Sequence, residues 1–412
     1  MIPTAEEGAV DVFDAKRGWA LGLVLALGAA AAGCGADGGS TGPDVVAVRV
    51  EPAATLAVGV GDTVRFTAKV VDGVGVQVTG ASVTWRSANA AVATVDGQGR
   101  TVSVAAGTTT VTATSGGVSG TASLEVWAPA TVTVYQPGTS YFGRQSYVEY
   151  IPGELPFILS APHGGSLTPS EIPDRTSGTT VTDTNSRETL LAVREALIVR
   201  TGKAPHVVIS HLKRIKLDPN REIVEAAAGN PFAENAWNEF HAYLEVASAA
   251  VTKTYRSGFY ADIHGHGHAI ARAELGYMLS ATQLNRTDAE INAPGVAAQS
   301  SIRALAASSP LPFAQLLRGS MSLGGLMQKE GVRSVPSPGD PSPGSDEYFT
   351  GGYNTERHGS LAAGRTVSGV QIELPLPGIR DTAANRQAFG EALARALEAY
   401  MTEHFGFFRT PK

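Results

Sequence analysis

Cysteine is nearly absent from this sequence, which has one such residue, Cys34, in 412. A single cysteine excludes an intramolecular disulfide, so stability must come from packing. Charge is also sparse, because Asp, Glu, Lys and Arg make up 17% of the chain and the formal net charge is -6. This balance gives no electrostatic argument for a nucleic-acid partner. The length nevertheless exceeds one ordinary core and predicts more than one domain.

A long hydrophobic run is missing as well. The apolar stretch at residues 19–32 is too short and too rich in Ala and Gly for a typical membrane span. Two basic residues precede it and small residues follow, which is the layout of a secretory signal. The stretch AAGC resembles the lipobox of bacterial lipoproteins, and this resemblance implies that Cys34 is lipidated. An ordinary signal peptide that happens to contain a cysteine is the alternative.

The N-terminal stretch therefore predicts an exported protein. We expect residues 1–33 to be a lipoprotein signal peptide and the Gly-rich residues 34–44 to be a flexible tether. The expected location is the bacterial cell envelope, with membrane contact only through the N-terminal lipid anchor.

Residues 45–127 are dense in Val, Thr and Ala with period-two alternation, as in DTVRFTAKVV and TTTVTATS. Short, regularly spaced strands predict an all-β sandwich. The stretches VTWRSANAAVATVDGQGR and VAAGTTTVTATSGG resemble bacterial immunoglobulin-like domains of group 2, and this resemblance implies that Trp85 is a core residue. We expect a spacer or adhesion module that can contact a cell surface or a polymer.

After a short linker at residues 128–131, the composition changes, and helix-period stretches alternate with strand-like runs. Residues 132–412 are therefore predicted to form an α/β domain with a mixed, mainly parallel sheet flanked by helices. Its last helix follows Asp381, which is a favourable N-cap. In such sheets the ligand lies beyond the C-terminal ends of the strands.

Four polar motifs follow the predicted strands, namely SAPHGG, HLKRIKLDPNRE, ADIHGHGH and QIELP. Two histidines, His163 and His264, and one carboxylate would satisfy zinc in an open catalytic site. The glycines after His163 would allow the backbone to approach a ligand closely. His266 and His268 lie on the Gly-rich exit from the strand, where they could contact substrate, shuttle protons or simply face solvent.

The order of these motifs resembles the zinc carboxypeptidase-type exopeptidases, and most closely the N-formylglutamate amidohydrolases, over roughly residues 150–400. The resemblance implies that His163 and His264 bind Zn²⁺ and that Glu373 is the general base or acid. It also implies that Arg221, helped by Asn220, holds a substrate carboxylate, which a guanidinium can grip in a bidentate way. For Arg221, a surface ion pair with Glu222 or Asp218 is the alternative.

The third metal ligand departs from the carboxypeptidase pattern, because Ser166 stands where that pattern has a glutamate. Glu171, Asp183 and Glu188 remain as candidates. The stretch TDTNSRETL resembles the acidic segment of the formylglutamate-type relatives, which favours Asp183. A helix N-cap is the alternative role for Asp183.

The Gly-rich stretch FTGGYNTERHGS, residues 349–360, carries Tyr353 and Arg357. These side chains could close over a substrate, or the stretch could be an ordinary surface loop. Taken together, the motifs predict a zinc-dependent amidohydrolase that uses zinc-activated water on a small acidic amide or peptide. N-formyl or N-acyl amino acids, γ-glutamyl compounds and peptide C-termini are the substrates considered. A catalytically inactive surface-binding protein is the alternative.

Overall fold

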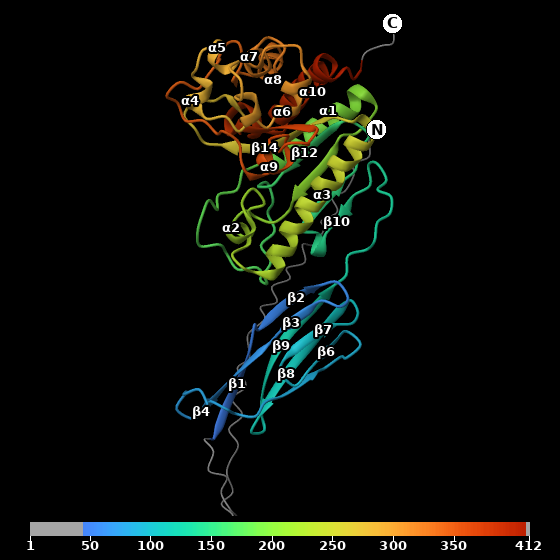
Figure 1. Cartoon of the computed structure of the whole chain (residues 1–412), viewed down its shortest axis with the longest axis vertical. Helices are drawn as coiled ribbons and strands as arrows, with labels where there is room; N and C mark the ends of the chain where they lie inside the picture. Colours follow the sequence, from blue (N-terminus) through green and yellow to red (C-terminus); the bar gives the residue numbers. More distant parts are fainter. Residues whose placement is uncertain (1–43, 409–412) are drawn as a thin grey trace, which may run out of the picture. The chain divides into compact units, whose positions relative to one another are not determined.

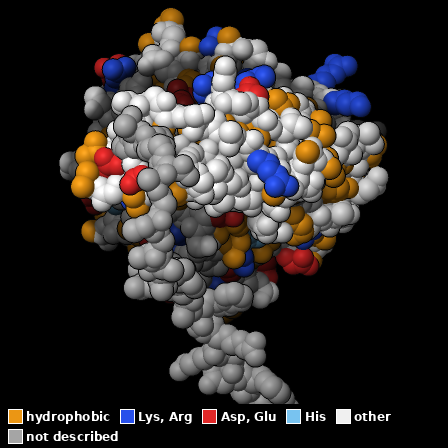
Figure 2. Space-filling model, turned by 90° about the horizontal axis from the view of Figure 1, so that it is seen from below, with side chains coloured by type: hydrophobic (Ala, Val, Ile, Leu, Met, Phe, Trp, Pro, Cys, Tyr) orange, Lys and Arg blue, Asp and Glu red, His pale blue; other side chains and the backbone are white. Residues whose placement is uncertain are grey.

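The computed structural model describes residues 44–408. The predicted signal peptide, nearly all of the predicted tether and the predicted lipidation site Cys34 lie outside the described residues. Within residues 44–408, no helix is both long and apolar enough to cross a membrane. Figure 2 shows charged side chains of both signs scattered among uncharged ones on one face of the molecule.

The first part of the described chain consists of short β-strands (Figure 1). They are β1 (Val45–Glu51), β2 (Ala54–Val58), β3 (Thr63–Arg65), β4 (Thr67–Asp72), β5 (Thr84–Ser87), β6 (Ala93–Val95), β7 (Arg100–Ser103), β8 (Gly107–Ser115) and β9 (Val118–Trp127). They form a four-stranded sheet, β2-β9-β8-β5, a three-stranded sheet, β3-β7-β6, and the pair β1-β4. The predicted all-β module is confirmed. Trp85 packs against its core but is only half-buried, whereas Phe66 and Leu124 are fully buried.

An eight-stranded sheet organises the second part of the chain. Its strands are β10 (Tyr141–Phe142), β11 (Val148–Ile151), β12 (Phe157–Ala161), β13 (His206–Ser210), β14 (Gly258–His266), β15 (Ala273–Gly276), β16 (Ser334–Val335) and β17 (Val367–Pro375). Their order is β10-β11-β13-β12-β14-β17-β15-β16. The central strands β13, β12, β14 and β17 are parallel, whereas β11 and β15 join them in the antiparallel sense. The predicted mixed α/β sheet is confirmed.

Helices flank this sheet (Figure 1). They are α1 (Ser186–Thr201), α2 (Ile223–Ala227), α3 (Pro231–Tyr255), α4 (Ala281–Leu284), α5 (Asp288–Ile291), α6 (Arg303–Ser308), α7 (Phe313–Arg318), α8 (Leu323–Lys329), α9 (Tyr353–His358) and α10 (Ala383–Phe405). Three of them, α1, α3 and α10, coincide with the helix-period stretches. The N-cap of α10 is Thr382, whose hydroxyl accepts from the backbone N–H of Asn385, so the expected cap at Asp381 is wrong by one residue.

Period-two alternation divides the central strands between two cores. On β14, Phe259, Ala261 and Ile263 join the core that includes α1 and α10. Tyr260 joins the other core, which includes α3. The same alternation on β17 sends Ile372 to the α1–α10 side. His264 follows Ile263 and Glu373 follows Ile372, so the alternation directs both polar side chains to the α3 side of the sheet.

Candidate metal centre

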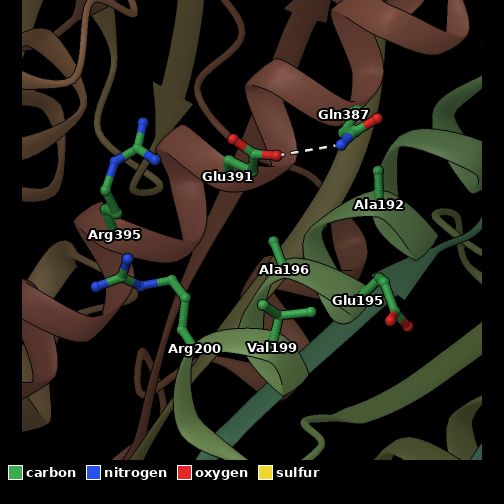
Figure 3. A pocket seen from close by; sticks show the side chains of 8 residues that line it. All are labelled: Ala192, Glu195, Ala196, Val199, Arg200, Gln387, Glu391 and Arg395. Atoms are coloured by element: carbon green, nitrogen blue, oxygen red, sulfur yellow. Dashed lines mark hydrogen bonds between the residues drawn. The ribbon is translucent and has the colours of Figure 1, made fainter.

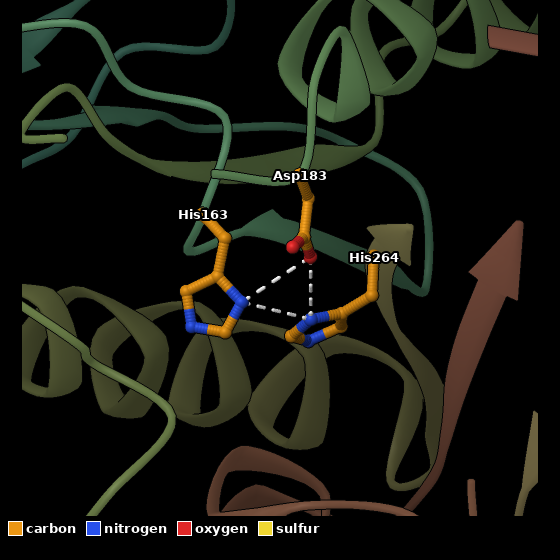
Figure 4. A group of neighbouring side chains, drawn as sticks. All are labelled: His163, Asp183 and His264. Carbon is orange, nitrogen blue, oxygen red and sulfur yellow. Dashed lines mark hydrogen bonds and ion pairs between the residues drawn. The ribbon is translucent and has the colours of Figure 1, made fainter. Parts of the chain in front are cut away.

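Three side chains from separate segments meet at the C-terminal edge of the sheet (Figure 4). Nδ1 of His163 lies 3.1 Å from Nδ1 of His264, and Oδ2 of Asp183 lies 3.3 Å from the first and 3.2 Å from the second. All three side chains are buried. The structure thus brings together the three residues predicted as metal ligands, His163, Asp183 and His264, which we call the metal triangle.

The second ring nitrogen of each histidine faces a buried carboxylate. Nε2 of His163 donates to Asp218 over 2.6 Å, and Nε2 of His264 donates to Asp262 over 2.7 Å. Protons on the two Nε2 atoms leave lone pairs on the two Nδ1 atoms, which point at each other and at Asp183. Three acceptors that converge in this way can share a cation.

The spacing of these acceptors fits zinc. Zn–N and Zn–O bonds of about 2.0–2.2 Å place two ligand atoms of a tetrahedral site roughly 3.3–3.5 Å apart. The three separations of 3.1–3.3 Å lie at or just below the lower end of that range. The donor set of two imidazoles and one carboxylate also suits this metal.

Further hydrogen bonds hold Asp218 and Asp262, the two outer carboxylates. We call these two residues and the groups that bind them the outer layer of the site. Asp218 accepts from Nε of Arg214 over 3.0 Å and from the backbone N–H of Asn220. Asp262 accepts from Asn354 on α9 over 3.1 Å and from the hydroxyl of Ser160. Burial acts to raise the pKa of both carboxyls, but the adjacent histidine and the other charges and hydrogen bonds around each group together lower both pKa values. Both groups therefore remain acceptors for the histidine N–H.

Asp183 lies just before α1 but does not cap it, because Asn185 occupies the N-cap position. Its Oδ2 also accepts from the backbone N–H of Gly265 over 3.1 Å.

Burial acts to raise the pKa of Asp183, yet the charges of His163 and His264 lower it. In turn, burial acts to lower the pKa of His264, while Asp262 and Asp183 hold it well above its ordinary value. The group therefore favours a positive charge at its centre.

Glu373 is the register partner of His264 on the neighbouring parallel strand. Its Oε1 lies 4.0 Å from Nδ1 of His264 and accepts from Nε2 of Gln371 over 2.8 Å. Its Oε2 is buried and has no hydrogen-bond partner among the described residues. Burial raises the pKa of Glu373 to about 7. A carboxyl with such a pKa can both take up and release a proton near neutral pH.

The two other carboxylates considered as ligands lie elsewhere. Glu171 binds Arg144 over 2.5 Å and accepts from Tyr147, while Glu188 pairs with its neighbour Arg187 over 3.0 Å. Of the three carboxylates weighed from the sequence, Asp183 alone contacts both histidines.

Arg221 is held beside the outer layer rather than among the ligands. Its Nη1 donates to the carbonyl of Asn220 over 2.7 Å and its Nε lies 3.4 Å from Glu225, which replaces Glu222 and Asp218 as the observed ion-pair partner. Asn220 is buried, donates to Gln371 over 3.3 Å and accepts from the backbone N–H of Asn354 over 2.8 Å. About a third of the Arg221 side chain is exposed, at 35%.

Residues 349–360, for which closure over a substrate and an ordinary surface loop were the two interpretations, contain the short helix α9. Nη1 of Arg357 donates to the hydroxyl of Tyr353 over 2.8 Å, and its guanidinium lies 4.9 Å from the ring centroid of Trp237 on α3. These contacts direct both side chains to α3, and neither contacts the metal ligands. Instead, α9 supplies Asn354 to the outer layer, a contribution that sequence reasoning missed.

His266 belongs to β14, so the strand continues past the point where the glycines suggested its end. Its ring contacts Arg272 and His268 and no residue of the metal triangle.

The glycines that follow His163 and His264 serve protein packing. A Cβ at Gly164 would overlap the backbone of Arg187, and one at Gly265 would overlap the guanidinium of Arg380.

A separate cavity of about 440 Å³ lies between α1 and α10 (Figure 3). Its lining residues are Ala192, Glu195, Ala196, Val199, Arg200, Gln387, Glu391 and Arg395. None of them belongs to the metal triangle or to its outer layer.

Comparison with known proteins identifies the first part of the chain. Residues 44–126 match the family model of the bacterial Ig-like domain, group 2, in agreement with the predicted module at 45–127. A structure of domains 5–6 of the S-layer protein SbsC is 21% identical, with 26% of this chain and 60% of that chain covered and a TM-score of 0.20. This chain covers 19% of the SbsC structure with domains 1–6.

The second part of the chain is similar to two other solved structures. N-formylglutamate amidohydrolase from Ralstonia eutropha JMP134 is 13% identical, with 61% of this chain and 97% of that chain covered and a TM-score of 0.38. Gene product Atu2144 from Agrobacterium tumefaciens is 15% identical, with 62% and 95% covered and a TM-score of 0.36. No curated protein matches the chain.

Proposed function

We propose that this protein is an exported, zinc-dependent amidohydrolase that cleaves an amide bond of a substrate bearing a carboxylate. The observation that carries the proposal is the convergence of His163, Asp183 and His264 on one point, with ligand atoms 3.1–3.3 Å apart. The two histidines are oriented by buried carboxylates, as metal-binding histidines commonly are.

Zinc bound there would polarise the substrate carbonyl and lower the pKa of a water molecule. Glu373 takes the proton of the attacking water and returns it to the departing amine, so that one water and one amide give a carboxylate and an amine. Its position beside His264 and its raised pKa support this role.

Arg221 and Asn220 are proposed to recognise the substrate carboxylate. The exposed part of Arg221 pairs with Glu225, which is itself 45% exposed, so a substrate carboxylate can replace this partner at little cost. Tyr353 and Arg357 are proposed to line the surrounding binding surface, because Arg357 contacts Tyr353 and the indole of Trp237, which in turn donates to the carbonyl of Arg221. An N-formyl or N-acyl amino acid, a γ-glutamyl compound and a peptide C-terminus all present the required carboxylate.

The N-terminal part supports a function in the cell envelope. We propose that Cys34 carries the lipid anchor and that the Ig-like module holds the hydrolase domain away from the membrane or contacts a surface polymer. The match of residues 44–126 to a bacterial Ig-like family also favours a second candidate, a surface-binding protein without catalysis.

The test is amine release by the purified protein, stripped with a chelator and then reloaded with Zn²⁺. N-formylglutamate, N-acetylglutamate, γ-glutamyl dipeptides and short peptides form the panel. The proposal predicts activity only in the loaded protein and none in Asp183→Asn. Asp174→Asn is the matched control, because Asp174 is an exposed carboxylate in the same segment. One zinc per chain without any amine release would favour the surface-binding candidate, and no zinc at all would contradict the metal site.

A further inference from the structure

A second group of metal-binding side chains lies at the end of β14 and on β15. It consists of His266, His268 and Glu274, and one ligand atom from each lies within 4.8 Å of the others. His266 and Glu274 are buried, and His268 is half-buried. None of the three belongs to the metal triangle or to its outer layer.

The ring of His266 is fixed in the tautomer that a metal ligand needs. Its Nε2 donates to the backbone carbonyl of Arg272 over 2.8 Å, which leaves a lone pair on Nδ1. Among residues 44–408, that lone pair accepts only the backbone N–H of His268, over 3.1 Å. A ring N–H held by a backbone carbonyl is a common outer contact of a metal-binding histidine.

Glu274 is a fully buried carboxylate without a strong basic partner. Within residues 44–408 it accepts from Nδ1 of His268 and from the backbone N–H of Phe349, each over 2.8 Å, and it pairs with no Lys or Arg. The nearby guanidinium of Arg272 lies 3.3 Å from Asp346 instead. The guanidinium of Arg380 donates to the carbonyls of Leu374, Thr184 and His266. A buried carboxylate in these surroundings calls for a positive charge beside it.

His268 gives this group access to solvent. Its ring stacks on Phe349 with centroids 4.7 Å apart and planes 5° from parallel, and 18% of its side chain is exposed. An ion could therefore enter from the His268 side, while the ring itself stays oriented.

We propose that His266, His268 and Glu274 form a second divalent-cation site, with a donor set suited to Zn²⁺. The site shares no ligand with the first, although His266 lies on β14, the strand that also carries His264. Glu274 lies on β15, beyond the intervening strand β17. Glu373 on that strand pairs in register with His264 on one side and with Glu274 on the other. The proposal does not depend on the hydrolase activity.

Occupancy of this site would steady the segment that follows Phe349. Phe349 contacts two of the three ligands, and the chain then passes through Gly352, where a Cβ would overlap the side chain of Asn220. Two residues later, Asn354 donates to Asp262 in the outer layer of the first site. The second cation would thus support the first site indirectly, through Phe349 and Asn354.

The test is zinc stoichiometry, measured by equilibrium dialysis against Zn²⁺ followed by elemental analysis of the whole protein. Wild type is expected to hold about two zinc ions per chain and His268→Asn about one. Glu274→Gln is expected to match His268→Asn. His404→Asn serves as the matched control and should keep both, because His404 lies on α10 and bonds to the carbonyl of Met321.

The variants also separate this proposal from the proposed function. Asp183→Asn should keep the zinc ion that His268→Asn loses, and thermal melts of each variant identify any that has not folded. Cobalt substitution adds a spectroscopic check, since His268→Asn should remove part of the visible absorbance. A single zinc ion in wild type that Asp183→Asn loses and His268→Asn keeps would overturn the second site and leave the first intact. A single zinc ion with the reverse pattern would support the second site alone.

Discussion

Nδ1 of His264 and Oε1 of Glu373 lie 4.0 Å apart because the two residues are register partners on parallel strands. This distance is too long for a hydrogen bond, so the two groups can face a common ligand without bonding directly to each other. The sheet itself therefore sets the spacing between a metal ligand and the group proposed to move protons.

Replacing Glu373 should separate catalysis from metal binding. In Glu373→Gln, kcat/KM is expected to fall by about 10²–10⁴, because an amide cannot take up the proton of water, while zinc content stays unchanged. Steady-state kinetics and elemental analysis on the same sample provide the measurement. The exposed Glu195→Gln is the control. Loss of zinc together with activity would instead make Glu373 a ligand.

The outer carboxylates should control metal affinity. Asp218→Asn and Asp262→Asn keep an oxygen that can accept the histidine N–H but remove its charge, so zinc should bind about 10–100-fold more weakly. Competition with a chromophoric chelator measures this change. Asp340→Asn is the control. It removes a carboxylate that pairs with Arg333 and with none of the proposed ligands, so zinc affinity should not change. Unchanged affinity in both outer variants would show that these carboxylates only support packing.

Arg221 should matter for acidic substrates in particular. Arg221→Ala is expected to lower kcat/KM about 10–100-fold for a substrate with a free carboxylate and to have little effect on its carboxamide analogue, because a charge-assisted hydrogen bond is lost. Glu225→Gln removes the competing partner and should not weaken binding. Equal losses on both substrates would indicate a structural role for Arg221.

The stability of the protein should fall in mildly acidic solution. Burial lowers the pKa of His206 to about 4, and its Nδ1 accepts from the hydroxyl of Tyr150 over 2.9 Å. The unfolded chain takes up this proton near pH 6.5, so the stabilisation is complete above that pH and is lost as the pH falls toward 4. The total effect is about 3 kcal/mol. Urea melts between pH 7 and 4 should show a shallower decline for His206→Gln, and an equal decline would implicate other groups.

Much of the fold was predictable because its signals are local. Period-two alternation indicated the β module, and helix-period stretches located α1, α3 and α10 to within a few residues. The metal triangle was also predictable in part, since His163 and His264 each follow a buried strand. Asp183 could be chosen only through a family resemblance, because its own segment contains no strand or helix.

The outer layer was harder to predict, because it depends on long-range packing. The Asp-x-His spacing alone does not predict that Asp262 supports His264, because in an ideal strand residues two apart are separated by more than a hydrogen bond. Asn354 gave no signal, because the Gly-rich stretch around it did not predict α9. The ion pair of Arg221 with Glu225 likewise depends on the short helix α2.

The indole of Trp237 connects two segments that matter to the proposed site. Its Nε1 donates to the carbonyl of Arg221 over 2.9 Å, and the guanidinium of Arg357 on α9 lies over its ring. The other described tryptophans, Trp85 and Trp127, belong to the Ig-like module. A change in intrinsic fluorescence on substrate addition that is lost in Trp237→Phe would report on this connection, so Trp237 offers a natural optical probe of the proposed site that needs no label.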